Sequence, residues 1–336
     1  MKTKFQVLIL AAGKGTRMKS SKAKVLHEVF YAPMIHHVLN AVNSLDAEQQ
    51  IVVVGHQQDT VKESLAGYDV VYAVQKEQLG TGHAVLSAEE HLMVTSGVVM
   101  ILCGDTPLVR TETLQEMLEL HFGRKSQVTV MTTTLANPTN YGRIISDENG
   151  YVLQIVEEKD ASSAQRKISE VNAGIYCVDV DFLCRTLKKV GTDNQQGEVY
   201  LTDIVEVATG DGLQVSKFVC QDSDEVLGVN SRIELAQAHA ALQDRYHRFL
   251  MMSGVTLYQP STIVIENTVS IASDTIIYPN VSISGSTIIG HNCLIESFTD
   301  IKDCHIGNHV TIGTGSHIHG GEFADNQAIG PCFKNF

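Results

Sequence analysis

Three basic side chains and two glycines lie close together near the start of the chain, in an arrangement that suits phosphate. Gly13 and Gly15 follow an apolar run, and Lys14, Arg17 and Lys24 add positive charge within the same short stretch. Glycines let backbone N–H groups point into one concavity, which favours an anion. This much positive charge suits a triphosphate. The alternative is an ordinary turn between a strand and a helix with surface lysines.

A carboxylate follows a second apolar run, residues 98–102. Asp105 comes after Cys103 and Gly104 at the point where that run ends. Mg²⁺ prefers oxygen ligands, and proteins often hold it with one or two side chains together with substrate phosphates. Asp105 is therefore a candidate metal ligand, although a lone aspartate after a strand is more often a turn or cap residue.

A third apolar run, residues 70–74, leads into Gln75, Gly80 and Gly82. The side-chain amide of Gln75 offers donors and an acceptor, which suits the edge of a pyrimidine base. The glycines allow a ligand to approach the backbone closely. The alternative is a glycine-rich entry into a helix that binds nothing.

Buried strands must bring these groups to one place. Helical periodicity in residues 33–42 and near residues 61–65 alternates with short apolar runs, which is typical of an α/β protein with a parallel sheet. Ligands of such sheets bind beyond the carboxyl ends of the strands, where the candidate groups lie. A further strand at residues 128–132 and an Asn-Gly turn at residues 149–150 predict β-hairpin insertions. The apolar runs expected to form the central strands are residues 7–10, 51–54, 70–74 and 98–102.

The string from Leu10 to Lys24 resembles the signature of the sugar-1-phosphate nucleotidyltransferases, Leu-x-x-Gly-x-Gly-Thr-x-Met and then, after four residues, Pro-Lys. Ala23 stands where that family usually has proline, and Lys24 keeps its register. The segment from Gln75 to Ala84 resembles the uracil-binding segment of bacterial N-acetylglucosamine-1-phosphate uridylyltransferases. The resemblance implies a Rossmann-like nucleotidyltransferase domain with a mixed, mostly parallel sheet.

The same resemblance implies which residues bind the nucleotide. Gln75, Gly80 and Thr81 are expected to contact uridine. Cys103 stands where close relatives usually have tyrosine, so its side-chain contact is in question whereas backbone contacts there would survive. The other implied nucleotide-binding positions are Leu10, Ala11, Ala12, Gly13, Lys24, Cys103, Gly104 and Asp105.

Catalytic roles follow from the resemblance as well. Arg17 is expected to stabilise the pyrophosphate leaving group, and Lys24 to neutralise charge on the reacting phosphates. Asp105 and Asn230 are expected to hold Mg²⁺. Without the resemblance, Asn230 would be interpreted as the cap of the helix that follows it.

A neutral sugar needs uncharged and acidic hydrogen-bonding groups. By resemblance, Gly142, Glu157 and Asn172 bind the N-acetylglucosamine moiety. Nothing else in the sequence distinguishes these three from surface loop residues.

Isoleucine recurs every six residues in the last part of the chain and, after a one-residue slip, the series resumes. The positions are Ile265, Ile271, Ile277, Ile283, Ile289, Ile295 and Ile301, then Ile306, Ile312 and Ile318. Such a period predicts a parallel β-helix with a stacked isoleucine core, and it resembles the left-handed hexapeptide-repeat β-helix of related acyltransferases. We therefore expect a nucleotidyltransferase domain at 1–232, a connecting helix at 233–253 and a short left-handed β-helix at 254–336.

Two expectations concern this repeat region. In the resembling bifunctional family its later turns carry acetyl transfer, and since those motifs are absent here we expect no acetyltransferase activity. Such β-helices commonly trimerise, which makes a homotrimer a hypothesis for this chain.

Composition restricts the class of protein. Among the 336 residues, 25 Lys and Arg against 38 Asp and Glu give a net charge of −13, which argues against a nucleic-acid-binding surface. The first residues show no apolar segment or cleavage site, so we expect no signal peptide, no apolar run is long enough to span a membrane, and the seven cysteines form no CxxC pair. We expect a cytoplasmic protein with reduced thiols. His317 and His319 fit a solvated strand face better than a zinc site.

The resemblance therefore predicts a Mg²⁺-dependent uridylyltransferase that makes UDP-N-acetylglucosamine, a precursor of cell-wall polymers, from UTP and N-acetylglucosamine 1-phosphate. Two alternatives stay open at this stage. One is a nucleotidyltransferase for another sugar 1-phosphate or base, and the other is a non-catalytic scaffold that binds sugar nucleotides. An acyltransferase is a weaker third, because the repeat region is short.

Overall fold

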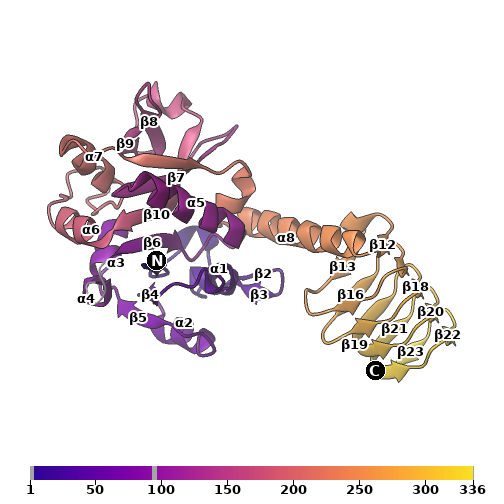
Figure 1. Ribbon diagram of the computed structural model, residues 1–336. Helices are drawn as coiled ribbons and strands as arrows, with labels where there is room; N and C mark the ends of the chain where they lie inside the picture. Colours follow the sequence, from indigo (N-terminus) through magenta and orange to yellow (C-terminus); the bar gives the residue numbers. More distant parts are fainter. Residues whose placement is uncertain (1–3, 93–96, 336) are drawn as a thin grey trace. The chain divides into compact units, whose positions relative to one another are not determined.

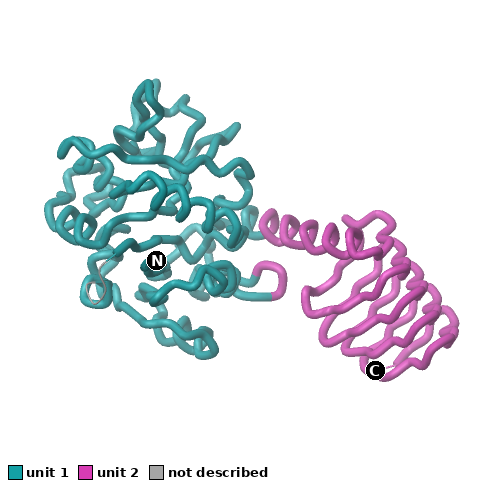
Figure 2. The backbone as a smooth tube through the Cα atoms, viewed as in Figure 1, with its two compact units in different colours: residues 1–28, 32–235 teal, residues 29–31, 236–336 magenta. Residues whose placement is uncertain are grey.

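The computed structural model describes residues 4–92 and 97–335 (Figure 1). The chain forms two compact units (Figure 2). Unit 1 comprises residues 1–28 and 32–235, and unit 2 comprises residues 29–31 and 236–336. The three-part division expected from the sequence stays a prediction.

Unit 1 is built on a nine-stranded sheet whose main path is β11-β7-β10-β6-β1-β4-β5. The pairings make six of these seven strands run in one direction, because only β10 is antiparallel to its neighbours. The predicted mixed, mostly parallel α/β sheet is confirmed. The strands of the path are β1 (Phe5–Leu10), β4 (Gln50–Val54), β5 (Val71–Val74), β6 (Val98–Cys103), β7 (Val128–Thr134), β10 (Glu170–Asp179) and β11 (Ser216–Val219).

Both faces of the sheet are covered because side chains alternate along each strand. In β1, Val7 and Ile9 pack into the core beneath α1 (Met34–Asn43) and α5 (Thr111–Arg124). Leu8 points to the opposite core, which also contains residues of α3 (Thr81–Leu86), α6 (Val180–Leu187) and α7 (Asp203–Gly210). Two helical layers therefore hold the strands from either side, and the strand ends stay free for a site. Shorter helices α2 (Gln58–Ser64) and α4 (Glu89–Leu92) complete this unit.

The predicted insertion is present. β8 (Arg143–Ser146) and β9 (Val152–Val156) pair antiparallel around the Asn-Gly turn. Gly150 there has a φ of +84°, which this turn requires. β8 joins the main sheet through Val171 of β10, opposite Arg143.

Unit 2 contains a parallel β-helix, as the isoleucine repeat predicted. Corresponding strands pair parallel at an offset of eighteen residues at first, as in Ile265 with Ile283. The offset drops to seventeen further on, as in Ile301 with Ile318, which accounts for the one-residue slip in the sequence. The change occurs within β19 (Asp300–Ile306), a longer strand that takes part in two faces. The strands before it are β12 (Thr256–Leu257), β13 (Val264–Ile265), β14 (Ser270–Ile271), β15 (Ile276–Ile277), β16 (Ser282–Ser284), β17 (Ile288–Ile289) and β18 (Leu294–Ile295), and those after it are β20 (Thr311–Ile312), β21 (His317–Phe323), β22 (Ala328–Ile329) and β23 (Lys334–Asn335).

Helix α8 (Arg232–Met252) closes the first coil of the β-helix. Leu250 belongs to the β-helix core, and Tyr246 packs against that core. Gln243 Nε2 donates to the carbonyl of Ile263 at 2.7 Å, and Tyr246 Oη donates to the carbonyl of Val269 at 2.5 Å. The end of the stack is thereby shielded from water, as a repeat structure needs. No helix in the described part of the chain is both long and apolar enough to cross a bilayer.

Candidate active site

A cavity of about 470 Å³ lies at the carboxyl ends of β1, β5 and β6. It is the place at which parallel sheets of this kind bind ligands. Its lining residues are Leu10, Ala11, Ala12, Gly13, Lys14, Lys24, Val25, Gln75, Gln78, Gly80, Thr81, Ala84, Cys103, Asp105 and Glu198. Most of the nucleotide-binding positions expected from the sequence are in this set.

The loop after β1, which contains Gly13 and Gly15 and is expected to bind phosphate, folds tightly against Lys24. β1 ends at Leu10, whose carbonyl accepts from the N–H of Gly104 at 2.9 Å. Gly15 has a φ of +61°, and a Cβ added there would lie 2.6 Å from Cβ of Lys24. Any other residue at Gly15 would push Lys24 away, so this glycine is needed for the position of the lysine.

Four side chains from three distant parts of the sequence meet at the edge of this cavity. The Lys24 ammonium forms a short ion pair with Oδ2 of Asp105 and donates to Oδ1 of Asn230 at 2.6 Å. Arg17 donates to the same Asn230 oxygen at 2.8 Å. Lys24 and Asp105 are 13% and 19% exposed, so their charges interact with little screening by water. The structure therefore assembles all four residues to which the sequence assigned catalytic or metal-binding roles.

The Asn230 side chain is oriented by its own loop. Its Nδ2 donates to the carbonyl of Gly228 at 2.9 Å, and this leaves Oδ1 for the two cations. The loop itself is tied to Asp105, whose carbonyl accepts from the N–H of Val229 at 2.8 Å. A Cβ on Gly228 would lie 3.4 Å from Asn230 Nδ2 and 3.6 Å from Asp105 Oδ1, so the backbone of this loop passes within contact distance of both side chains.

The oxygens of Asp105 and Asn230 suit Mg²⁺. In the described chain no cluster of three or more His, Cys, Asp and Glu side chains could hold a metal unaided. A carboxylate and an amide oxygen nevertheless converge on one cation, the Lys24 ammonium. Two protein oxygens completed by substrate phosphates are the usual surroundings of Mg²⁺ in phosphoryl transfer. The donor set therefore fits the ion.

The base-binding segment is fixed by hydrogen bonds of its own. Gln75 is only 3% exposed, and its Nε2 lies 3.1 Å from the carbonyl of Gly80 and 3.0 Å from Nδ1 of His83. Gly80 has a φ of +109°, and a Cβ there would lie 2.5 Å from the carbonyl oxygen of Val199. Thr81 lines the cavity, but its hydroxyl accepts from the N–H of Leu201 at 3.0 Å. That hydroxyl anchors the segment to residues 199–201.

The three residues expected to bind the sugar form a second cluster. The N–H of Asn172 donates to the carbonyl of Gly142 at 2.8 Å, and a Cβ on Gly142 would lie 3.5 Å from Oε1 of Glu157. Burial raises the pKa of Glu157, and a hydrogen bond from Thr202 at 3.4 Å opposes that rise. Neither these three residues nor Arg17, Gly104 and Asn230 line the 470 Å³ cavity itself.

Cys103 lies between the two groups. It lines the cavity, and its Sγ lies 3.8 Å from the carbonyl of Gly174, whose N–H donates to Asn172 Oδ1 at 2.9 Å. Burial raises the pKa of the Cys103 thiol to about 12, so this side chain is neutral at physiological pH. Cys103 therefore serves as a small apolar boundary between the cavity and the second cluster.

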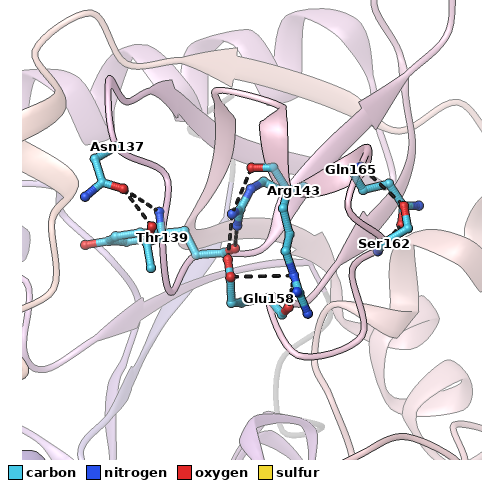
Figure 3. Close-up of polar contacts among 8 residues, drawn as sticks. Asn137, Thr139, Arg143, Glu158, Ser162 and Gln165 are labelled. Atoms are coloured by element: carbon cyan, nitrogen blue, oxygen red, sulfur yellow. Dashed lines mark hydrogen bonds and ion pairs between the residues drawn. The ribbon is translucent and has the colours of Figure 1, made fainter.

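An ion pair next to Gly142, between buried Arg143 and partly exposed Glu158, holds the loop of the second cluster. Arg143 is 1% exposed, and its guanidinium donates to Oε2 of Glu158 at 2.5 Å and to the carbonyl of Arg166 at 3.3 Å. Figure 3 shows Arg143 and Glu158 pointing toward one another, with the turns around Asn137 and Ser162 on either side. Arg143 also donates to the carbonyl of Tyr141, so it fixes the residue next to Gly142.

Sequence reasoning missed several residues at the site. Gln78 and Val25 line the cavity without having been selected, and Glu198, which lies in a segment (residues 197–204) that also resembles the family and was assigned only a supporting role, lines it as well. Tyr141 is also close to the catalytic charges. Burial raises its pKa to about 12, and the charges of Glu234 and Asp105 contribute to the rise. Its position next to Gly142 was the available signal for Tyr141, and the family-like segment 197–204 was the signal for Glu198.

Comparison with known proteins identifies a family and several similar proteins. A model of the nucleotidyl transferase family matches residues 6–243. "Bifunctional protein GlmU" of Desulfotalea psychrophila is 47% identical over 323 residues, covering 96% of this chain and 95% of the relative. Proteins of the same name from Geotalea uraniireducens and Halalkalibacterium halodurans are 48% and 43% identical. The matches cover 96% and 98% of this chain, and 71% and 72% of those relatives.

Proposed function

This chain belongs to the nucleotidyl transferase family, and from that premise we propose that it makes UDP-N-acetylglucosamine and pyrophosphate from UTP and N-acetylglucosamine 1-phosphate. The observation that carries the proposal is the convergence of Arg17, Lys24, Asp105 and Asn230 at one edge of a cavity of nucleotide size. It is an enzyme rather than a scaffold, and the comparisons give no support to the alternatives.

The reaction is a displacement at phosphorus. An oxygen of the sugar phosphate attacks the α-phosphorus of UTP, the bond to the oxygen that bridges toward the β-phosphate breaks, and pyrophosphate leaves. Positioning and charge stabilisation supply most of the catalysis in such transfers, so no protein nucleophile is required. Lys24 neutralises charge on the reacting phosphates, and Arg17, which is exposed at the edge of the loop, stabilises the departing pyrophosphate.

Nucleotidyltransferases of this kind generally use a divalent metal ion, and we assign Mg²⁺ to Asp105 and Asn230. When bound, the ion neutralises charge on the phosphates of the nucleotide. Asp105 and Asn230 would hold the ion through their side-chain oxygens, while Lys24, which contacts both oxygens, contributes a second positive charge at the same place.

Base recognition rests on Gln75 and Gly80. Both line the cavity, and Gly80 N–H makes no hydrogen bond to any residue that the structure describes. An N–H donor and an amide oxygen acceptor are complementary to O4 and N3–H of uracil. Gly142, Glu157 and Asn172 supply the backbone and side-chain acceptors that sugar hydroxyls need, and Cys103 separates them from the nucleotide cavity.

The β-helix is proposed to form a homotrimer, as the family resemblance implies. Exposed aromatic side chains on its surface support an interface, since Tyr258 and Tyr278 pack edge to face at 5.3 Å and Phe298 is 64% exposed. Sedimentation at micromolar concentration would show a trimer, and a monomer would overturn this part. The free thiols of all seven cysteines support the expected cytoplasmic location.

Pyrophosphate release tests the proposal directly. The purified chain with Mg²⁺, UTP and N-acetylglucosamine 1-phosphate should release pyrophosphate, and glucose 1-phosphate in a parallel reaction should give little. Release only with another sugar or nucleotide would contradict the proposed substrates while keeping the mechanism. No release with any pair, despite binding of UDP-sugar, would contradict the proposal that the chain is catalytic.

A further inference from the structure

We propose that His83 is a positioning residue that sets the orientation of the Gln75 carboxamide and thereby the preference for uracil over cytosine. The inference rests on the proposed function, since it concerns the same nucleotide site. It goes beyond that function because His83 lies behind Gln75 and does not line the cavity.

The orientation of the carboxamide follows from its partners. The carbonyl of Gly80 can only accept, so the Gln75 atom 3.1 Å from it must be the nitrogen Nε2. The same Nε2 lies 3.0 Å from Nδ1 of His83. One N–H of the amide is therefore directed to Gly80 and the other to His83.

His83 must then be an acceptor at Nδ1. An imidazole nitrogen that carries hydrogen could not face an N–H donor, so His83 is neutral and bears its hydrogen on Nε2. His83 is part of the first turn of α3, which begins one residue after Gly80, so the histidine and the carbonyl are held on one short rigid segment. The two acceptors therefore act together on a single amide group.

The consequence concerns the remaining atom, Oε1 of Gln75. It accepts no hydrogen bond from any described residue. It is also not completely buried, so a ligand can reach it. Because Gln75 lines the cavity, this oxygen is the acceptor that a base would meet. Uracil presents N3–H to such an acceptor, whereas cytosine presents the lone pair of N3, and two acceptors repel one another.

Rotation of the carboxamide would reverse the preference. The amide nitrogen would then face the base and suit cytosine N3, but Oε1 would lie against the carbonyl of Gly80. The acceptor on His83 opposes that rotation as well, since it would lose its donor. Removing this acceptor leaves Gly80 alone to hold the amide, so discrimination should weaken without a change in the phosphate-binding residues.

Two matched variants test the role. His83→Leu removes the acceptor and keeps bulk, while His83→Asn can place its Oδ1 near the former Nδ1 position. We expect His83→Leu to raise the KM for UTP and to lower the ratio of kcat/KM for UTP to that for CTP by about tenfold or more, with kcat for UTP within about twofold of the wild type. His83→Asn should restore most of the ratio.

The outcomes separate this inference from the proposed function. A wild-type enzyme that does not prefer UTP to CTP would overturn the proposed function. A wild-type preference that persists unchanged in a folded His83→Leu variant would overturn only the role of His83. Equal losses with both nucleotides and with the sugar phosphate would mean a general structural role, and would also overturn it.

A measurement on the unsubstituted protein covers the case in which His83→Leu does not fold. The ¹⁵N chemical shifts of the His83 ring, recorded at neutral pH, distinguish hydrogen on Nε2 from hydrogen on Nδ1. The inference requires Nε2–H both with and without UTP. Hydrogen on Nδ1 would overturn it.

Discussion

The two units of this protein use opposite ways of placing side chains. In the β-helix each coil contacts the next at an offset of seventeen or eighteen residues, so neighbours in space are neighbours in the repeat. In unit 1 the decisive contacts join Lys24 to Asp105, 81 positions away, and Arg17 to Asn230, 213 positions away. The packing of the β-helix can therefore be specified by local sequence. The proposed chemistry instead requires the whole sheet of unit 1 to assemble, because its residues come from distant parts of the chain.

The buried residues of the two units also differ in polarity. The isoleucine core of the β-helix is apolar, with relative exposures of 0–8% for the repeat positions. Unit 1 also buries ionisable groups, among them Arg143, Glu225 and His121, whose pKa burial lowers to about 4. Buried polar groups reduce stability unless they are paired. Unit 1 accepts that cost where it must hold loops and charges in place, whereas the polar side chains buried in the β-helix are hydroxyls that donate to backbone carbonyls, such as Thr275 to Gly290 at 2.8 Å.

The largest expected effect is a loss of activity when one of the charged side chains that meet at the cavity edge is removed. Lys24→Met should lower kcat/KM by about 10²–10³-fold, because a cation aimed at developing phosphate charge is lost. Lys22→Met is the matched control, since Lys22 is 45% exposed and pairs with Glu28 at 3.3 Å. It should leave activity within about twofold. Equal effects of the two substitutions would show that the net charge of the loop matters and the position of Lys24 does not.

Substitutions in the β-helix core should lower the stability of that unit and leave the enzymatic activity unchanged. Ile301 is fully buried between Ile283 and Ile318, and Ile301→Ala should cost about 2–5 kcal/mol in the free energy of unfolding that unit. Ile288→Ala, at a position that is 47% exposed, should change it by less than about 0.5 kcal/mol. Denaturant unfolding measures both. A large loss of kcat in folded Ile301→Ala protein would contradict the division between the two units.

The smallest effect concerns a titration in unit 1. Burial, with Glu206 and Asp160 nearby, raises the pKa of Asp203 to about 6 from its ordinary value of 3.8. Between these values the folded state keeps a proton that the unfolded state has released. This group therefore makes the free energy of unfolding decrease as pH rises from about 4 to about 6. In Asp203→Asn that contribution should vanish, so the variant should lose less stability than the wild type across the window. Parallel pH profiles of the two proteins would contradict the assignment.

Much of this molecule could be predicted from the sequence, and the reason differs between the units. The isoleucine period is local, so the β-helix could be predicted from it, and the slip in the period marks where the structure changes its pairing offset. Asp105 and Gln75 could be found because each follows an apolar run, and parallel strand ends meet at one edge. Lys24 could be found because it keeps its register in the string from Leu10 to Lys24 that resembles the family signature.

What could not be predicted depends on long-range pairing. Only the family resemblance selected Gly142, Glu157 and Asn172, which meet because β8 joins β10 and pairs with β9. Glu198 reaches the cavity because residues 199–201 bond to the segment after β5. His83 was part of a quoted motif, but its role follows from two distances to Gln75 and from no feature of spacing.

The most direct test of the account is pyrophosphate release by Asp105→Asn at a series of Mg²⁺ concentrations, with UTP and N-acetylglucosamine 1-phosphate. The substitution keeps the shape of the side chain and removes the charge that meets Lys24 and is assigned to Mg²⁺. The account predicts a folded protein whose turnover falls by at least about 10²-fold and does not recover at high Mg²⁺. Turnover at the wild-type level with the wild-type dependence on Mg²⁺ would contradict it.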